Sequence, residues 1–317
     1  MAVNVNNNLD QQGVDNDHKL LYYKNIEGTE IAVISETILR TLTLNEVINL
    51  IDETGKFREF EISTIAYLLC GLVNNHELTE SDIVKIKNKM NDAGYLNVIY
   101  EGFRHKDLLT LKYVTNFINY SSQFGYKKKD IERKKGSECG LDINYVTDYI
   151  TQKCKKFNDY IKKQKDKKFN DHIKKEDMEL KAIDLANTLN GLAQLGYKKE
   201  DFSNKFKVNI IVETINNKID EFSSIDLANT FNGLAQLGYK KGDFSDKLNL
   251  KDAIRAINRN CSSFNCVDLG NLINGLGKLG YTKKDFEDAS LTIYTAINAN
   301  VKEMSIIVIG NVINGLA

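Results

Sequence analysis

The sequence contains no proline at any of its 317 positions. Proline breaks helices because it lacks an amide hydrogen and clashes with the preceding turn, so helical segments can run uninterrupted here. The sequence also lacks an excess of charge of either sign, since 43 basic residues balance 43 acidic ones. That balance excludes an overall electrostatic attraction to nucleic acid or membranes, although a local one stays possible. With 42% hydrophobic residues, the chain can still bury a core.

Cysteine is scarce, and the five copies are scattered. An odd number in a chain too long to need disulfide bonds predicts reduced thiols, and the close pair Cys261 and Cys266 has no histidine nearby to complete a zinc site. Residues 1–19 lack the apolar core of a signal peptide, and no apolar run approaches the roughly 18 residues of a membrane span. We therefore expect a cytoplasmic protein, or one that reaches a host cell without a cleavable signal peptide.

Catalytic and metal-binding motifs are also missing. The sequence has no glycine-rich phosphate loop, no nucleophile elbow and no cluster of metal ligands. We therefore expect no enzyme activity, no cofactor, no metal and no small-molecule substrate, and we expect no membrane partner.

The sequence does contain a repeated motif, Asn-Gly-Leu. The glycine of Asn-Gly-Leu falls at positions 191, 233, 275 and 315, in steps of 42, 42 and 40 residues. Fixed periods of this length are typical of solenoids. Each period holds a first helix (helix A), a lysine-containing turn and a second helix (helix B), which together fill about 42 residues. The sequence thus predicts an all-α fold, a right-handed α-solenoid of helical hairpins with a period of about 42 residues.

Local signals define the ends of helix A. Ser223 is a candidate N-cap, and Asp226 follows at the position where a carboxylate favours free amides. The Leu-Gly-Tyr ending predicts a left-handed C-cap glycine at Gly196, Gly238 and Gly280. The glycines of Asn-Gly-Leu are interpreted as sites where a neighbouring helix approaches closely.

The remainder of the chain divides by composition and by weaker copies of the repeat. One convincing copy lies at Val114–Tyr126, and a second is aligned on Gly71. A tandem duplication, Lys156–Lys163 and Lys168–Lys175, indicates an insertion. The predicted organisation is a disordered Asn-rich tail over 1–24, capping helices over 25–60, two degenerate repeats over 61–135, a Lys-rich insertion over 136–177 and regular repeats over 178–317, with the last one truncated.

The stretch Leu185–Tyr197, with its Leu-x-x-Leu-Ala-x-Leu-Gly frame, resembles octotricopeptide-type and heptatricopeptide repeats, which occur beside RAP domains, and related repeats of intracellular bacteria. The resemblance covers about 180–317 well and 60–130 weakly. It implies an α-solenoid, and the organellar relatives act on RNA. This chain differs in having Asn-Gly where the organellar repeats carry Trp-Ala.

Two sets of residues could carry function. The first is a polar stripe along helix A, which could read bases with amide groups or could tie neighbouring helices together; both interpretations stay open. It comprises Asn187, Asn190, Gln194, Asn229, Asn232, Gln236, Asn271, Asn274 and Lys278.

The second set is the basic turn after each helix A, which could follow a phosphate backbone or could be solvated lysines near helix C-termini. It comprises Lys198, Lys199, Lys240, Lys241, Lys283 and Lys284. We expect a non-enzymatic binding scaffold, a protein-interaction or effector-type protein of an intracellular bacterium. The alternative is a single-stranded RNA-binding protein like the organellar RNA maturation factors.

Overall fold

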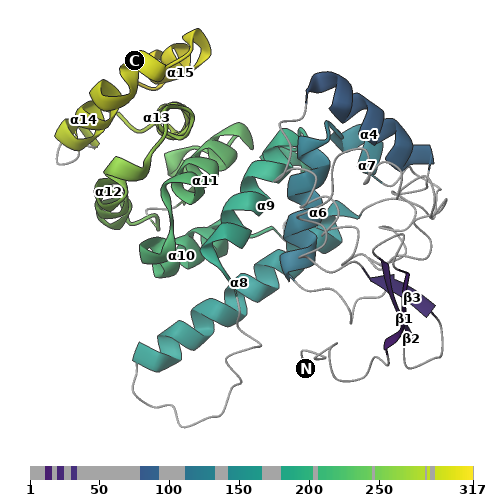
Figure 1. Cartoon of the computed structure of the whole chain (residues 1–317). Coiled ribbons are helices and arrows are strands. Elements are labelled where there is room, and N and C mark those ends of the chain that lie inside the picture. The colour runs from purple at the N-terminus through teal and green to yellow at the C-terminus, as the bar shows by residue number, and fades with distance from the viewer. Residues whose placement is uncertain are drawn as a thin grey trace. The chain divides into compact units, whose positions relative to one another are not determined.

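The computed structural model describes residues 11–15, 20–24, 30–33, 79–92, 111–132, 142–165, 180–202, 206–244, 247–282, 284–285 and 290–316. The chain forms two compact units, Met1–Asp142 and Ile143–Ala317. Helices dominate the described residues of both units (Figure 1). The predictions for Gly71 and for the capping helices after residue 33 fall outside the described residues.

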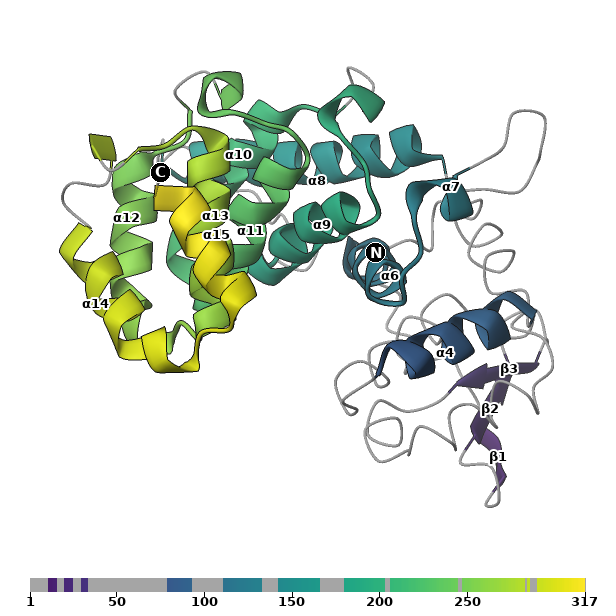
Figure 2. The ribbon, with the colours of Figure 1, turned by 90° about the horizontal axis from the view of Figure 1, so that it is seen from above.

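The first unit opens with a three-stranded antiparallel sheet in the order β1–β2–β3 (Figure 2). Its strands are β1 (Gln11–Asp15), β2 (Leu20–Lys24) and β3 (Glu30–Val33). The prediction of a disordered tail followed by helices was therefore wrong for these residues, whereas the described residues from 79 onward form helices and turns, as the all-α class predicts. The physical reason is local, because Leu-Leu-Tyr-Tyr and Glu-Ile-Ala-Val are rich in aromatic and β-branched residues, which favour strands.

Three helices follow among the described residues of the first unit: α4 (Glu80–Asp92), α6 (Leu111–Gln123) and the short α7 (Lys128–Ile131). The copy of the repeat recognised at Val114–Tyr126 corresponds to α6 and its C-terminal turn. The turn there reads Phe-Gly-Tyr; Gly125 has φ of +73° and Tyr126 is fully buried, in agreement with the match of these residues to Gly196 and Tyr197.

The second unit alternates A helices with B helices, as the repeat predicts. The A helices are α9 (Ala182–Gln194), α11 (Ser224–Gln236), α13 (Cys266–Leu279) and α15 (Ile306–Leu316). The B helices are α10 (Val208–Lys218), α12 (Leu250–Arg259) and α14 (Ser290–Asn300). Short 3-10 turns join them: η5 (Lys199–Asp201), η6 (Ile219–Glu221), η7 (Lys241–Phe244), η8 (Cys261–Ser263) and η10 (Val301–Glu303).

The A helices form one layer, in which each packs against the next in chain order (Figure 1). The apolar face predicted for α9 is buried: Leu185, Ala186, Leu189, Leu192 and Ala193 are at most 5% exposed. Burial of this face, at roughly 25 cal/mol per Å² of apolar surface, drives the stacking.

The ends of the A helices follow the local signals. Ser223 Oγ accepts a hydrogen bond from the Asp226 amide, and Asp226 accepts one in return from the Ser223 amide. At the other end, Gly196, Gly238 and Gly280 have φ of +94°, +90° and +89°, so the predicted left-handed caps are confirmed.

One helix lies where the sequence predicted an insertion. The 23-residue helix α8 (Ile143–Lys165) packs against α10 and buries Val146, Ile150 and Cys154 on one face. Inside that interface, Asn158 donates to the Ile210 carbonyl and accepts from Thr214. This part of the stretch is therefore a packed helix in which the buried Asn158 makes hydrogen bonds. Because the stretch is rich in lysine, the helical spacing of its apolar residues is hard to recognise in the sequence.

Candidate functional site

The A helices of the second unit contact one another at the glycines of their Asn-Gly-Leu motifs. A Cβ on Gly233 would lie 2.8 Å from the Asn190 amide nitrogen, and one on Gly275 would lie 2.7 Å from that of Asn232. A Cβ on Gly315 would lie 2.7 Å from the amide nitrogen of Asn274. Such distances are shorter than a real Cβ tolerates, so each glycine lets two helix backbones touch. The interpretation of these glycines as close-approach sites is confirmed at these three positions.

This close approach decides how exposed the polar stripe is. Asn190, Asn232 and Asn274 are buried, at 8%, 6% and 5% exposure, because the glycine of the next helix covers each of them. The outer members differ: Asn187, Asn229, Asn271 and Gln236 are half-buried, and Gln194 and Lys278 are exposed. The stripe therefore splits into an inner row between helices and outer rows that face outward.

The inner row is incompletely satisfied. Among the described residues, the Oδ1 atoms of Asn232 and Asn274 are buried and have no hydrogen-bond partner. An unpaired buried amide oxygen costs about 1–3 kcal/mol, so the side chains of these residues weaken the stack that their backbones allow. The inner asparagines are consequently part of the helix packing and are not accessible to a ligand.

Beside the outer amides runs a row of aliphatic side chains that the sequence analysis did not single out. Ile183, Ile225 and Val267 occupy the same position in successive A helices and are 50%, 51% and 53% exposed. At 100° per residue, Ile183 lies within about 60° of Asn187 and Gln194 around the helix. We call these residues and the outer amides the A face. The signal in the sequence was an apolar residue that recurs on the polar side of each helix A.

The lysines of the turns hold successive repeats together. Lys198 Nζ donates to the Gln236 carbonyl at 2.7 Å, and Lys240 Nζ donates to the Lys278 carbonyl at 2.6 Å. These carbonyls end the next helix A, where the helix dipole favours a cation. The structure thereby gives Lys198 and Lys240 a partner in the following repeat.

In the first two pairs, the second lysine forms an ion pair with the following turn. Lys199 Nζ lies 3.1 Å from Asp243 Oδ2, and Lys241 Nζ lies 3.3 Å from Asp285 Oδ2. We call these two pairs the lysine clasps. Lys283 falls outside the described residues, while Lys284 is described and exposed.

A related pair occurs in the first unit, where Lys87 Nζ lies 3.1 Å from both Asp130 Oδ2 and the Gly125 carbonyl. In that pair and in the clasps, the aspartate also caps its own turn. Asp243, for example, accepts from the Lys240 amide at 2.7 Å. Burial raises the pKa of Asp243, but the bonds from the Lys240 amide and from Lys199 outweigh it and hold the pKa below its ordinary value.

The tyrosines after Gly196 and Gly238 are core residues, whereas Tyr281, after Gly280, is half-buried. Tyr197 is fully buried, and Tyr239 is 6% exposed. Tyr197 stacks on Phe202, with ring centroids 6.0 Å apart. The buried rings of Tyr197 and Tyr239 cannot stack on bases, which requires an open ring face.

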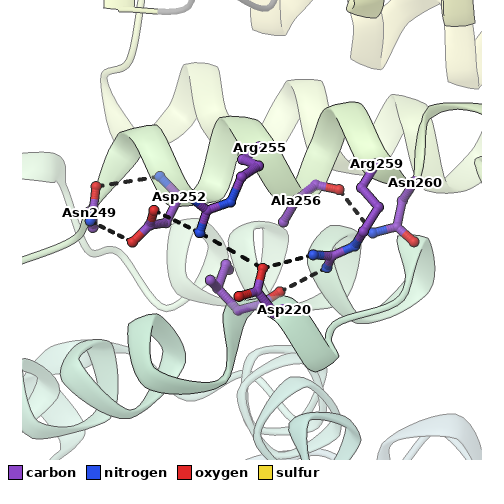
Figure 3. A network of polar contacts seen from close by, with 8 residues as sticks. Asp220, Asn249, Asp252, Arg255, Ala256, Arg259 and Asn260 are labelled. Carbon is purple, nitrogen blue, oxygen red and sulfur yellow. Dashed lines mark hydrogen bonds and ion pairs between the residues drawn. The ribbon is translucent and has the colours of Figure 1, made fainter. Parts of the chain in front are cut away.

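The B side of the second unit carries a polar network between η6 and α12 (Figure 3). Arg259 donates to the Asp220 carboxylate at 2.8 Å and to the Ile219 carbonyl at 3.2 Å. Arg255 pairs with Asp252 at 3.0 Å and lies 3.9 Å from Asp220. The contacts of Arg255 and Arg259 with η6 cross from one repeat to the next, so the network joins B-layer elements.

Within the part of the chain that the structure describes, no group of three or more histidine, cysteine or acidic residues could hold a metal ion. No described helix is long and apolar enough to cross a membrane. The two described free thiols differ in environment, since Cys154 is buried and Cys266 is half-buried.

Comparison with known proteins adds no identification: no family model matches the sequence, and no curated protein is similar to it.

Proposed function

We propose that residues 178–317 form a right-handed α-solenoid with a period of about 42 residues, and that the protein is a non-enzymatic scaffold. In this proposal the A face binds an extended segment of a partner protein. The observation that carries it is the row of Ile183, Ile225 and Val267, which recur at the same position with the same half-exposure.

The chemistry of the A face suits a polypeptide. Aliphatic side chains offer apolar contact, and the half-buried amides of Asn187, Asn229 and Asn271 offer both donors and acceptors. A peptide backbone needs both kinds of hydrogen bond. Packed helices lie about 8–10 Å apart, and an extended chain rises about 3.3 Å per residue, so each repeat would meet about three residues of the partner.

Single-stranded RNA is the alternative partner, in line with the resemblance to organellar repeats. RNA binding uses cations that follow the phosphates and aromatic rings that stack on bases. Here the turn lysines bond to carbonyl and carboxylate groups of the next repeat, as shown for Lys198, Lys199, Lys240 and Lys241. The rings of Tyr197 and Tyr239 are buried. What favours RNA is the exposure of Lys278 and Lys284, which take no part in the clasps.

A binding measurement with RNA separates the two proposals. Fluorescence anisotropy of mixed-sequence single-stranded RNA with the full chain, across a salt series, should show no saturable binding at micromolar protein. The matched variant, Lys278→Gln with Lys284→Gln, removes exposed charge and keeps every clasp. Micromolar binding that weakens steeply with salt and is reduced in this variant would sink the protein-scaffold proposal in favour of RNA.

The resemblance to repeats of intracellular bacteria leads us to extend the proposal to an effector-type adaptor. Neither a cofactor nor a metal is part of it.

A further inference from the structure

The last A helix, α15, leaves open a face that the other A helices cover. Ile313 is 60% exposed, whereas the residues at the same position in the other A helices, Leu189, Phe231 and Ile273, are at most 3% exposed. Ile306 is 88% exposed, whereas Ala182 at the matching position is 4% exposed. Ile306, Ile309 and Ile313 recur at helical spacing, so they form one apolar face. We call it the α15 face.

The other side of α15 is packed against α13. Val308 and Val312 are each 6% exposed, and a Cβ on Gly315 would overlap the Ile273 carbonyl group. Helix α15 therefore packs against the preceding A helix in the same way as the other A helices do. The α15 face is the opposite side, which in the other A helices contacts the following A helix.

The internal interfaces show what covers this second side. On α9 the covering group is Gly233 of the next A helix, which lies over Leu189 and Asn190. On α11 it is Gly275, over Phe231 and Asn232. Ile313 and Asn314 are the residues of α15 at these positions, and both are exposed.

A second position on α15 has the same open side. A Cβ on Gly270 of α13 would lie 3.0 Å from Val308 Cγ1 of the next A helix. Gly310 is the matching residue of α15, and a Cβ there would meet no atom of the described chain within 4 Å. The open space and the exposed isoleucines are thus on the side that the next A helix takes elsewhere.

We propose that the α15 face is a docking surface for a further helical repeat of the same kind, with an Asn-Gly glycine seated over Ile313 and Asn314. The partner chemistry is specific because the internal interfaces bring backbone against backbone, which a helix with a side chain at that position cannot do. This inference rests on the packing of the A helices and does not depend on what the A face binds.

The test adds such a repeat to the full chain. A copy of residues 236–281 is joined after Ala317, which matches Ala235, so that the added segment continues the repeat in register. The control carries the same extension with Gly275→Leu in the added copy only. Hydrogen exchange measured on residues 306–316 should slow at least about tenfold in the extended chain, and the control should exchange like the parent chain.

A second readout uses Ile313→Ala. In the parent chain this exposed residue should tolerate the change with little shift in Tm, while in the extended chain, where it becomes buried, the same change should lower Tm by about 5 °C or more. Equal exchange in the extended chain and the control, or equal tolerance of Ile313→Ala in both backgrounds, would overturn the proposal.

The parent chain should also stay monomeric in light scattering at about 100 μM. A dimer that Ile313→Lys dissociates would overturn the proposal as well, since it would show that a second copy of this chain occupies the α15 face.

Discussion

Lys199 Nζ lies 3.1 Å from Oδ2 of Asp243, 44 residues further along the chain. Lys241 stands in the same relation to Asp285, also 44 residues away. Each lysine thus reaches the turn of the next repeat, where the aspartate caps the turn with its other bonds. Lys199 and Lys241 are for this reason part of the structure that joins repeats.

A double-mutant cycle measures the clasp. Lys199→Met and Asp243→Asn should each destabilise the protein, with a coupling energy of about 0.5 kcal/mol, because both side chains are about one-third exposed and solvent screens the pair. Urea unfolding at low salt gives the coupling, which should shrink near 1 M salt. Lys251→Met, an exposed lysine outside the clasps, is the control and should show no coupling to Asp243→Asn. Zero coupling for the first pair would remove the clasp as a stabilising element.

The aspartates of the clasps predict a loss of stability in acid. The pKa of Asp285 is lowered chiefly by the bond from the Thr282 amide, and the pKa of Asp243 is also lowered from its ordinary value. A carboxylate whose pKa is lower in the folded state stabilises the protein above its unfolded value of about 3.9, and this contribution is lost as pH falls through the folded value.

Urea midpoints measured from pH 6 to pH 2.5 should therefore fall below about pH 4. Asp243→Asn, with Asp285→Asn, should flatten that fall. A double variant with the same acid dependence as the parent chain would contradict the assignment.

The glycines at the helix contacts predict a sharp difference between two alanine substitutions. Gly275→Ala places a Cβ 2.7 Å from the Asn232 amide nitrogen, and that backbone cannot move aside alone, so we expect a loss of about 1–3 kcal/mol. Gly310→Ala is the matched control in an A helix, where the Cβ has open space. It should be neutral or should stabilise by up to about 1 kcal/mol. Equal effects in thermal unfolding would contradict backbone contact as the basis of the stack.

The thiol of Cys154 should resist modification in the native protein. It is completely buried between α8 and α10, and burial raises its pKa to about 12, so almost no thiolate exists at neutral pH. In a variant that keeps only Cys154, a disulfide reagent should react at the rate of unfolding. A variant that keeps only the half-buried Cys266 should react faster. Fast labelling of Cys154 in native buffer would show that this interface opens readily.

Features encoded within one helix could be predicted from the sequence. The cap at Ser223, the left-handed glycines such as Gly238 and the buried face of α9 all depend on residues a few positions apart. The close approach at Gly233 was also predictable, because the glycine recurs where a stacked helix must meet its neighbour.

Features that depend on distant partners could not be predicted in the same way. From the sequence alone, the polar stripe could serve either ligand binding or helix packing. The burial of Asn232 depends on the close approach of Gly275 of the next A helix. The clasp partner of Lys199 lies one repeat away and needs the packed array to be seen. The N-terminal sheet could not be predicted because the apolar residues from Ile31 onward also recur at helical spacing, and the strands depend on the pairing of β2 with β3.

The central claim, that the A face binds an extended polypeptide, is tested most directly by selection from a random peptide display library on the immobilised full chain. The counter-selection uses Ile225→Lys with Val267→Lys, which changes half-exposed side chains and should leave Tm unaltered. The account predicts enriched peptides that bind the parent chain and the Lys278→Gln, Lys284→Gln variant alike, and that bind the face variant at least about tenfold more weakly. Enriched peptides that bind the face variant as tightly as the parent chain, or no enrichment by a folded protein, would contradict it.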